Sequence, residues 1–298
     1  MSAREMEKLQ ELKKILKEMG SLLIAYSGGV DSTFLLAVAK EVLGSGVVAV
    51  TARSLTYPER EIASAAEMAQ KLKVRHRVID SEELSLPEFR NNPPDRCYYC
   101  KSELFSKLKD IAQEEGITWI ADGSNVDDDR DFRPGSRAVQ EMGIRSPLKK
   151  AGLAKEDIRK LSADMGLPTW DKPSIACLAS RFPYGEEITP EKLTMVERAE
   201  EYLLNLDFRQ VRVRHHQNIA RIEVEEEEIK KFFDPAVRKQ VIEKLKEIGY
   251  TYITLDLQGY RTGSMNEVLR EIKKSQHVKE ISEKVVKRVL SANSRFFR

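Results

Sequence analysis

Long apolar runs, a disulfide framework and an excess of charge of either sign are all lacking from this chain of 298 residues. No apolar run approaches the length that spans a membrane, so the sequence predicts no transmembrane helix. Fifty Lys and Arg against 48 Asp and Glu give a net charge of +2. The chain as a whole therefore lacks the strong excess of positive charge that is typical of nucleic-acid-binding proteins. Three cysteines are an odd count, and the N-terminus is charged and helical rather than a signal peptide. We therefore expect a cytoplasmic protein without disulfides.

A glycine-rich stretch between an apolar run and a helical pattern is the strongest local signal. Residues 22–26 are followed by Ser27-Gly28-Gly29-Val30-Asp31-Ser32, after which apolar residues recur at helical spacing. This order predicts a strand, a tight turn and a helix start, where glycines let the backbone approach an anion and the helix dipole favours it. No Lys follows the glycines, so the loop is not a Walker A motif. Asp31 either orients the loop or helps to hold a cation.

Strands alternate with helices along the first part of the chain, which predicts a parallel sheet covered on both faces. The expected strands are residues 22–26, 47–50, 74–79 and 117–121, and the expected helices include 4–19, 58–72, 98–115 and 153–165. Ligands of such sheets bind beyond the carboxyl ends of the strands. Residues 27–32, 51–54 and 122–125 all follow strand ends, so we expect them to share one nucleotide pocket.

From residue 190 onward the pattern changes and predicts a second, smaller α/β domain. It comprises a helix at 190–206, paired strands at 211–214 and 220–224, helices near 225–232 and 235–248, and a strand at 250–255. We place the first domain at 1–185, the second at 186–270 and a basic tail at 271–298, with eight Lys or Arg against three Glu. Residues 170–190 have little periodicity and are expected to form a linker or a functional loop. The charged loop at 127–135 is either solvated surface or functional.

The cysteines occur in two places. Cys97 and Cys100 have the two-residue gap that lets two thiolates reach one metal, and Cys177 follows much later in the chain. A zinc site usually needs a fourth ligand, and no His lies in a matching motif nearby. Three cysteines fit an iron–sulfur cluster with one iron left open. A redox pair would leave Cys177 without a role, and three buried thiols would need no metal at all.

The loop at residues 27–32 matches the Ser-Gly-Gly-x-Asp-Ser signature of the PP-loop ATP pyrophosphatases, which split ATP between its α and β phosphates. Further matches extend the likeness to residues 96–101, 122–125, 133–135, 177–185, 211–215 and 220–224. With these motifs the chain resembles the LarE-type ATP-dependent sulfur transferases over about residues 1–260. The resemblance implies a Rossmann-like, adenine nucleotide alpha-hydrolase-like fold for the first domain.

The resemblance also implies a reaction. ATP with Mg²⁺ would adenylate pyridinium-3,5-biscarboxylic acid mononucleotide, and a sulfur nucleophile would displace AMP to leave a thiocarboxylate for the nickel-pincer nucleotide cofactor. In one-cysteine members the residue that Cys177 matches gives up its own sulfur. Cys97 and Cys100 depart from that pattern and resemble the branch whose three cysteines hold a 4Fe-4S cluster, which carries sulfide from a sulfur donor. A homo-oligomer, with a hexamer as the expected form, is implied as well.

Roles for the nucleotide site follow from the same resemblance. Residues 27–32 would hold the ATP phosphates, with Asp31 near the magnesium ion. Cys177 would stand at the centre of sulfur transfer. The residues expected to border the nucleotide are Arg53, Ser54, Gly123 and Ser124.

Roles for charged residues near the substrate each have a plainer alternative. Arg181 would stabilise phosphate charge or the substrate carboxylate, or it is an ordinary surface residue. Arg212 and Arg214 alternate along one strand and point to one face, which suits a grip on the substrate phosphate or leaves an exposed basic strand face. Glu200 and Glu223 form either a substrate-side metal site or two solvated carboxylates.

Three other functions remain open from the sequence. A PP-loop tRNA thiolation enzyme would need a strongly basic surface, which only the short tail offers. An ammonia-using amide-forming ligase similar to NAD or GMP synthetases would leave the three cysteines without a role. A nucleotide-binding protein without enzymatic activity would not explain why the loop and the cysteines occur together.

Overall fold

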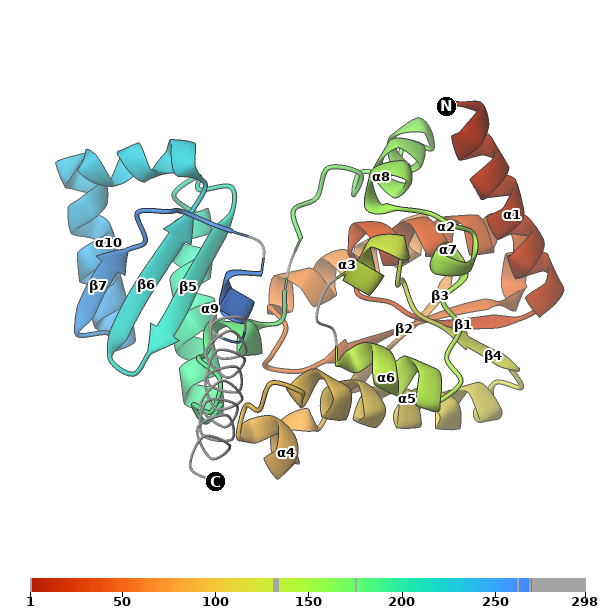
Figure 1. Ribbon diagram of the computed structural model, residues 1–298, viewed down its shortest axis with the longest axis horizontal. Coiled ribbons are helices and arrows are strands. Elements are labelled where there is room, and N and C mark those ends of the chain that lie inside the picture. Colours follow the sequence, from red (N-terminus) through yellow and green to blue (C-terminus); the bar gives the residue numbers. More distant parts are fainter. Residues whose placement is uncertain (1, 131–133, 175, 262, 268, 270–298) are drawn as a thin grey trace, which may run out of the picture.

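The computed structural model describes residues 2–130, 134–174, 176–261, 263–267 and 269, and it shows two α/β units side by side (Figure 1). The first unit contains a four-stranded sheet in the order β3-β2-β1-β4. Its strands are β1 (Leu22–Ala25), β2 (Val47–Arg53), β3 (Arg75–Asp80) and β4 (Trp119–Ala121). Every neighbouring pair in this sheet is parallel. The predicted α/β fold with a parallel sheet is therefore confirmed.

Helices cover both faces of the parallel sheet (Figure 1). They are α1 (Ala3–Met19), α2 (Val30–Leu43), α3 (Glu59–Lys71), α4 (Pro87–Arg90), α5 (Arg96–Glu114), α6 (Gly135–Glu141), α7 (Pro147–Lys150) and α8 (Lys155–Asp164). Apolar residues of α1, α2, α3 and α8 share one core with the sheet, whereas those of α5 and α6 share a second core on the opposite face. Both faces are buried, which explains why β1 and β2 are apolar along most of their length.

The second unit contains a three-stranded sheet in the order β5-β6-β7. Its elements are α9 (Pro190–Leu204), β5 (Val211–His216), β6 (Ile219–Val224), α10 (Pro235–Ile248) and β7 (Tyr252–Leu255). The β5 and β6 strands pair, as expected, and they do so antiparallel, whereas β7 pairs parallel to β6. Residues from α9 and α10 pack with all three strands in one core. The helix expected near 225–232 is a 3-10 helix, Glu226–Phe233.

A separate apolar cluster joins the two units. It contains Phe89 of α4 and Leu193 and Val196 of α9. It also contains Leu178 and Phe182 of the connecting segment, which runs from the end of α8 to the start of α9. The cluster therefore includes residues on both sides of the predicted boundary at 185. The connecting segment contains only one short regular element in its described part, a 3-10 turn at Leu178–Arg181. This packing holds the segment that carries Cys177 between the units.

Two predicted features fall partly or wholly outside the described residues. The basic tail at 271–298 is one, and residues 131–133 of the charged loop are the other. The described beginning of that loop is a 3-10 helix, Val126–Arg130. No helix in the described ranges is long and apolar enough to cross a membrane.

Candidate active site

The turn after β1 places polar groups at the N-terminus of α2, which no side chain of the described residues caps. Gly29 is the N-cap residue, so the N–H groups of the first turn and the positive end of the helix dipole are available to an anion. The hydroxyl oxygens of Ser27 and Ser32 lie 3.1 Å apart, and the Ser32 hydroxyl donates to the Gly29 carbonyl at 3.3 Å. The predicted strand, turn and helix start are confirmed here.

Gly28 is required at the closest approach between this loop and α3. Its φ of +68° lies in the left-handed region, and a Cβ atom there would stand 2.8 Å from the Cβ of Ala65. The Gly28 carbonyl accepts a hydrogen bond of 3.2 Å from Lys172, whose ammonium also pairs with Glu61 at 2.8 Å. The loop is therefore tied to α3 and to the segment that leads to Cys177.

A cavity of about 260 Å³ opens above this loop. The predicted nucleotide residues that line it are Ser27, Gly29, Asp31, Ser32, Gly123 and Ser124. Gly123 allows the two strand ends to meet, because a Cβ atom on it would lie 3.1 Å from the Ser32 nitrogen. The end of β2 contributes Val50, Thr51 and Ala52 to the wall. The structure thus brings the loop and the residues after β4 together around one cavity.

Arg53 and Ser54 lie outside this cavity and border a neighbouring one of about 370 Å³. The strand was expected to end at residue 50, but β2 continues to Arg53, where its register partner is Asp80 of β3. The exposed Arg53 guanidinium donates to the Asp80 carboxylate at 2.8 Å. Ser54 bonds with Thr56 at 2.9 Å and donates to Glu83. The contact of Arg53 with Asp80 and those of Ser54 with Thr56 and Glu83 therefore hold both side chains at the neighbouring cavity.

Asp31 lies in the first turn of α2 with two differently placed oxygens. The Oδ2 atom accepts from the Lys155 ammonium at 2.5 Å. The Oδ1 atom is buried and has no hydrogen-bond partner among the residues that the structure describes. A carboxylate oxygen left without a donor beside a phosphate cavity suits a hard divalent cation such as Mg²⁺. Sequence reasoning missed Lys155, since 124 residues separate it from Asp31.

Asp122 is a second carboxylate that sequence reasoning did not assign a role. It is buried and accepts hydrogen bonds from the Ser124 hydroxyl at 2.5 Å and the Ser146 hydroxyl at 2.7 Å. The Lys101 ammonium lies 3.6 Å from Oδ2, the oxygen that also accepts from the Ser124 hydroxyl. Asp122 therefore orients Ser124 at the edge of the cavity. The signal in the sequence that could have revealed this role was the position of Asp122 directly before Gly123 and Ser124.

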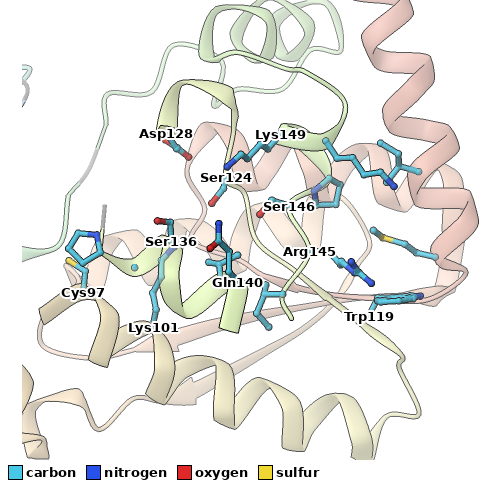
Figure 2. Close-up of a pocket in the computed structure, with 18 of the residues that line it drawn as sticks. Cys97, Lys101, Trp119, Ser124, Asp128, Ser136, Gln140, Arg145, Ser146 and Lys149 are labelled. Atoms are coloured by element: carbon cyan, nitrogen blue, oxygen red, sulfur yellow. The ribbon is translucent and has the colours of Figure 1, made fainter. Parts of the chain in front are cut away.

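A larger cavity of about 750 Å³ adjoins the first (Figure 2). The residues that line both are Lys101, Ser124 and Asp128. Figure 2 shows Cys97 at one end of this larger cavity and Trp119 at the other. Cys97 and Lys101 are four residues apart on α5 and so share a face of the helix. Sequence reasoning missed this cavity, which has room for a second nucleotide-sized ligand beside the first.

The structure brings the three cysteines into one neighbourhood around Tyr57. Burial raises the pKa of Tyr57 well above its ordinary value, and the charges of all three cysteines add to that shift. Burial likewise raises the pKa of Cys100 well above its usual range and raises that of Cys177. Cys97 is exposed. Tyr57 also lines the loop cavity, so the thiols lie next to the nucleotide site.

These thiols do not form a preformed metal centre. Across the part of the chain that the structure describes, no group of three or more His, Cys, Asp or Glu side chains is arranged to hold a metal ion. The three thiols are nevertheless close enough to act electrostatically on one another. The donor set is therefore right for an iron–sulfur cluster, whereas the ligand geometry is not already in place.

Arg181 is buried and holds the loop that carries Cys177. Its Nε and Nη2 atoms donate to the Glu200 carboxylate at 2.7 and 2.9 Å. Its Nη1 atom donates to the carbonyls of Ala176 at 3.0 Å and Cys177 at 3.1 Å. Burial by itself would raise the pKa of Glu200, but the charge and hydrogen bonds of Arg181 outweigh it and hold that pKa below its ordinary value. The expectation of an ordinary surface arginine is wrong.

Arg212 and Arg214 are both buried where β5 meets the cysteine-bearing segment. Arg212 donates to the Ser174 carbonyl at 2.6 Å, and Arg214 donates to the Ser180 carbonyl at 2.6 Å. Arg214 also forms two hydrogen bonds, of 2.9 and 2.8 Å, with the buried Glu223. Burial lowers the pKa of Arg212 to about 10, so it stays protonated at neutral pH. The alternative prediction of an exposed basic strand face is therefore wrong. The alternative that Glu200 and Glu223 are solvated carboxylates is wrong as well.

Comparison with known proteins covers most of the chain. The family model described as Asparagine synthase matches residues 15–90. The chain is 46% identical over 262 residues to the uncharacterized protein slr1717 of Synechocystis sp., which is 88% of this chain and 98% of that protein. It is 40% identical over 257 residues to pyridinium-3,5-bisthiocarboxylic acid mononucleotide synthase of Lactiplantibacillus plantarum, or 85% of this chain and 92% of that enzyme. The uncharacterized protein MJ0830 of Methanocaldococcus jannaschii is 30% identical over 260 residues, 86% of this chain and 98% of that protein.

Proposed function

Because this chain belongs to the LarE-type PP-loop family that includes pyridinium-3,5-bisthiocarboxylic acid mononucleotide synthase, we propose that it thiolates a carboxylated pyridinium mononucleotide at the expense of ATP. AMP is attached to a carboxylate with release of pyrophosphate, and sulfur then replaces AMP. The observation that carries the proposal is the place of Tyr57, which lines the loop cavity and whose pKa is raised by burial and by the charges of all three cysteines. Activation and sulfur transfer can therefore take place within one continuous site.

The activation step uses the loop at residues 27–32. A carboxylate is a poor acceptor for a nucleophile, and attachment of AMP supplies a good leaving group. The uncapped N-terminus of α2 would hold the phosphates, and the serine hydroxyls would add donors. Mg²⁺ held by Asp31 would neutralise phosphate charge, and the buried, unpartnered Oδ1 supports that role. Lys155, which now pairs with Asp31, would then be released toward the phosphates.

The substrate lies beside ATP in the larger cavity. Lys101 borders both cavities and is placed to attract the carboxylate that is to be activated. Arg212 and Arg214 contact the carbonyls of Ser174 and Ser180 in the segment that carries Cys177. We keep these two arginines as the phosphate-binding pair, since a dianionic phosphate would compete well with the neutral carbonyls of Ser174 and Ser180.

The transfer step uses the thiols. Cys97, Cys100 and Cys177 would hold a 4Fe-4S cluster, which would supply a binding place for sulfide and so spare the protein's own sulfur. Arg181 acts here as a positioning residue, because it fixes the carbonyls on either side of the Cys177 backbone. The alternative is loss of the Cys177 sulfur itself. Both routes share the same activation step.

Pyrophosphate release tests the activation step. Protein purified without oxygen is mixed with ATP, Mg²⁺ and the mononucleotide, and pyrophosphate, AMP and the mass of the product are measured. We expect thiocarboxylate only when sulfide is present. The Asp31→Asn variant should release pyrophosphate at least about a hundredfold more slowly, because it lacks the carboxylate that would hold Mg²⁺ against the phosphate charge developing in the reaction. Wild-type protein that releases no pyrophosphate would contradict the proposed function.

Iron content separates the two routes of sulfur transfer. We expect about four irons and matching acid-labile sulfide per wild-type chain. The Cys97→Ala variant should lose them and still release pyrophosphate. If the wild type holds no iron and Cys177 loses the mass of a thiol during turnover, the cluster route is wrong and the sacrificial route remains.

A further inference from the structure

Lys172 lies in the segment that leads to Cys177, and its ammonium reaches the phosphate loop across 144 residues. It donates to the Gly28 carbonyl at 3.2 Å and pairs with the Glu61 carboxylate of α3 at 2.8 Å. Ser27 and Gly29 line the loop cavity, whereas Gly28 and Lys172 do not. Lys172 therefore contacts the loop outside the nucleotide site.

The peptide between Gly28 and Gly29 has a direction that matters for phosphate binding. Neither residue has a Cβ atom, so this peptide is free to turn either way. A trans peptide is planar, and its carbonyl oxygen and N–H group point in opposite directions. The contact of Lys172 with the Gly28 oxygen thus fixes where the Gly29 N–H points.

The Gly29 N–H points toward the loop cavity. It donates to the Ser27 hydroxyl oxygen at 3.4 Å, and both residues line that cavity. A hydrogen bond of this length is weak, so a phosphate oxygen can replace the hydroxyl as its acceptor. Lys172 therefore aims a backbone donor at the place where the phosphates of ATP would lie.

The segment around Lys172 is itself held by Arg159 of α8. Arg159 donates to the carbonyl of Trp170 at 2.6 Å and to that of Lys172 at 2.8 Å. Lys155 lies one turn earlier on the same face of α8 and pairs with Asp31 of α2 at 2.5 Å. One helix thus contacts both the phosphate site and the segment, so the two are fixed relative to each other.

We propose that Lys172 is a positioning residue that sets the phosphate loop for ATP only while the segment leading to Cys177 is docked in these contacts. The inference rests on the ATP-binding step of the proposed function and adds a coupling between that step and the sulfur-transfer segment. Coupling between two sites is reciprocal. A docked segment strengthens ATP binding, and ATP strengthens docking by the same factor.

ATP affinity tests the effect on the loop. Isothermal titration with ATP and Mg²⁺, without the mononucleotide, gives the Kd of the wild type and of the variants Lys172→Met, Lys172→Arg and Lys192→Met. Lys192 is the matched control, because it too donates to one carboxylate, Glu186 at 3.1 Å, and to one carbonyl, that of Glu187 at 2.9 Å. We expect the Kd to rise at least about tenfold in Lys172→Met, less in Lys172→Arg, and not in Lys192→Met.

The charge of Glu61 needs a control of its own. Glu61 lines the loop cavity, and Lys172→Met would take away one of its partners. In the double variant of Lys172→Met with Glu61→Gln, we expect the Kd to stay at least about tenfold above that of Glu61→Gln alone, because the Gly28 carbonyl is still not held. Equal Kd values in these two proteins would mean that the released carboxylate repels ATP, and the proposal would be wrong.

Hydrogen exchange tests the coupling to the segment. The N–H groups of Trp170 and Lys172 donate to the carbonyls of Leu167 and Thr169 at 3.2 and 3.1 Å, so their exchange reports on the docked segment. ATP with Mg²⁺ should slow this exchange at least about fivefold in the wild type and in Lys192→Met, and not in Lys172→Met. A lysine with a structural role alone would lower stability in urea and leave the response to ATP unchanged.

Two further results would overturn the role of Lys172. One is an unchanged Kd in Lys172→Met, and the other is exchange that ATP slows equally in that variant and in the wild type. If Lys172→Met does not fold, Arg159→Gln decides, because it releases the segment and leaves the loop unaltered: its Kd should rise, and an unchanged Kd would contradict the coupling. Thiocarboxylate formation by the wild type is measured in parallel. If ATP binds as expected and no thiocarboxylate forms, the proposed function fails and the role of Lys172 stands.

Discussion

At the scale of single residues, the ion pair of Arg181 and Glu200 supports the loop that carries Cys177. Both side chains are almost fully buried, at 1% and 3% exposure. Removal of one partner leaves the other charge unpaired in a place that water does not reach, which costs about 3–5 kcal/mol. We expect Glu200→Gln to lower the free energy of unfolding in urea by that amount. The exposed Glu247, paired with Lys244, is the matched control, and Glu247→Gln should change little. Equal losses in the two variants would contradict this account.

The same pair predicts a dependence on acid. The pKa of Glu200 lies below its ordinary value of 4.5 in the folded protein, despite the opposing effect of burial, because Arg181 stabilises the carboxylate. A folded-state pKa below the unfolded value stabilises the protein above about pH 4.5, and that contribution is lost as the pH falls further. Urea unfolding between pH 7 and pH 3 should therefore show a steeper fall in stability for the wild type than for Glu200→Gln. Parallel curves would argue against a charged Glu200.

The thiols should differ in reactivity. Cys97 is exposed, whereas burial raises the pKa of both Cys100 and Cys177. Alkylation requires the thiolate and access to it. Iodoacetamide should therefore label Cys97 first at neutral pH in iron-free protein, and labelling of the other two should gain relative to it as the pH rises. Mass mapping of the labelled peptides gives the order in which the cysteines are alkylated. Labelling of Cys177 before Cys97 would contradict the assignment of Cys177 as the buried thiol and Cys97 as the exposed one.

At the scale of elements, the contact between the phosphate loop and α3 depends on Gly28. A methyl group there would collide with Ala65 at 2.8 Å, and the positive φ adds strain. We expect Gly28→Ala to lower the free energy of unfolding by about 1–3 kcal/mol and to weaken ATP binding at least about tenfold. Gly20 is the matched control, because it has a similar φ of +70° and open space around it.

Gly20→Ala should lose about 1 kcal/mol from backbone strain alone and should bind ATP normally. Isothermal titration and urea unfolding measure both quantities. An unchanged ATP affinity in Gly28→Ala would mean that the loop tolerates a shift against α3. The comparison therefore separates strain of the backbone from displacement of the loop.

At the scale of the whole molecule, the two units share one apolar cluster. Phe182 lies on one side of residue 185 and Leu193 on the other, and both are buried in that cluster. Separation of the chain at that point would expose both surfaces to water. We expect fragments 1–185 and 186–298 to be insoluble alone and to copurify when they are produced together, as size-exclusion chromatography of the pair would show. Two fragments that fold and stay apart would place an independent domain boundary there.

Local pattern in the sequence determined the backbone of the site. The apolar run, the paired glycines and the helical spacing were enough to predict the strand, turn and helix start around Gly28 and Gly29. Alternation of strands and helices then predicted the parallel sheet. It also predicted that Ser124 would lie near Ser32, because carboxyl ends of parallel strands meet at one edge.

Only the tertiary structure decided which charged groups meet. Lys155 contacts Asp31 across 124 residues, and Arg214 reaches Ser180 across 34, so no local pattern records either contact. Arg53 was expected at the nucleotide and pairs with Asp80, because β2 runs three residues further than its apolar pattern. The larger cavity and the contact of Lys172 with Gly28 likewise arise from packing between distant elements. The free energy of a buried charge depends on the partners that the fold brings to it, and a sequence pattern does not contain that information.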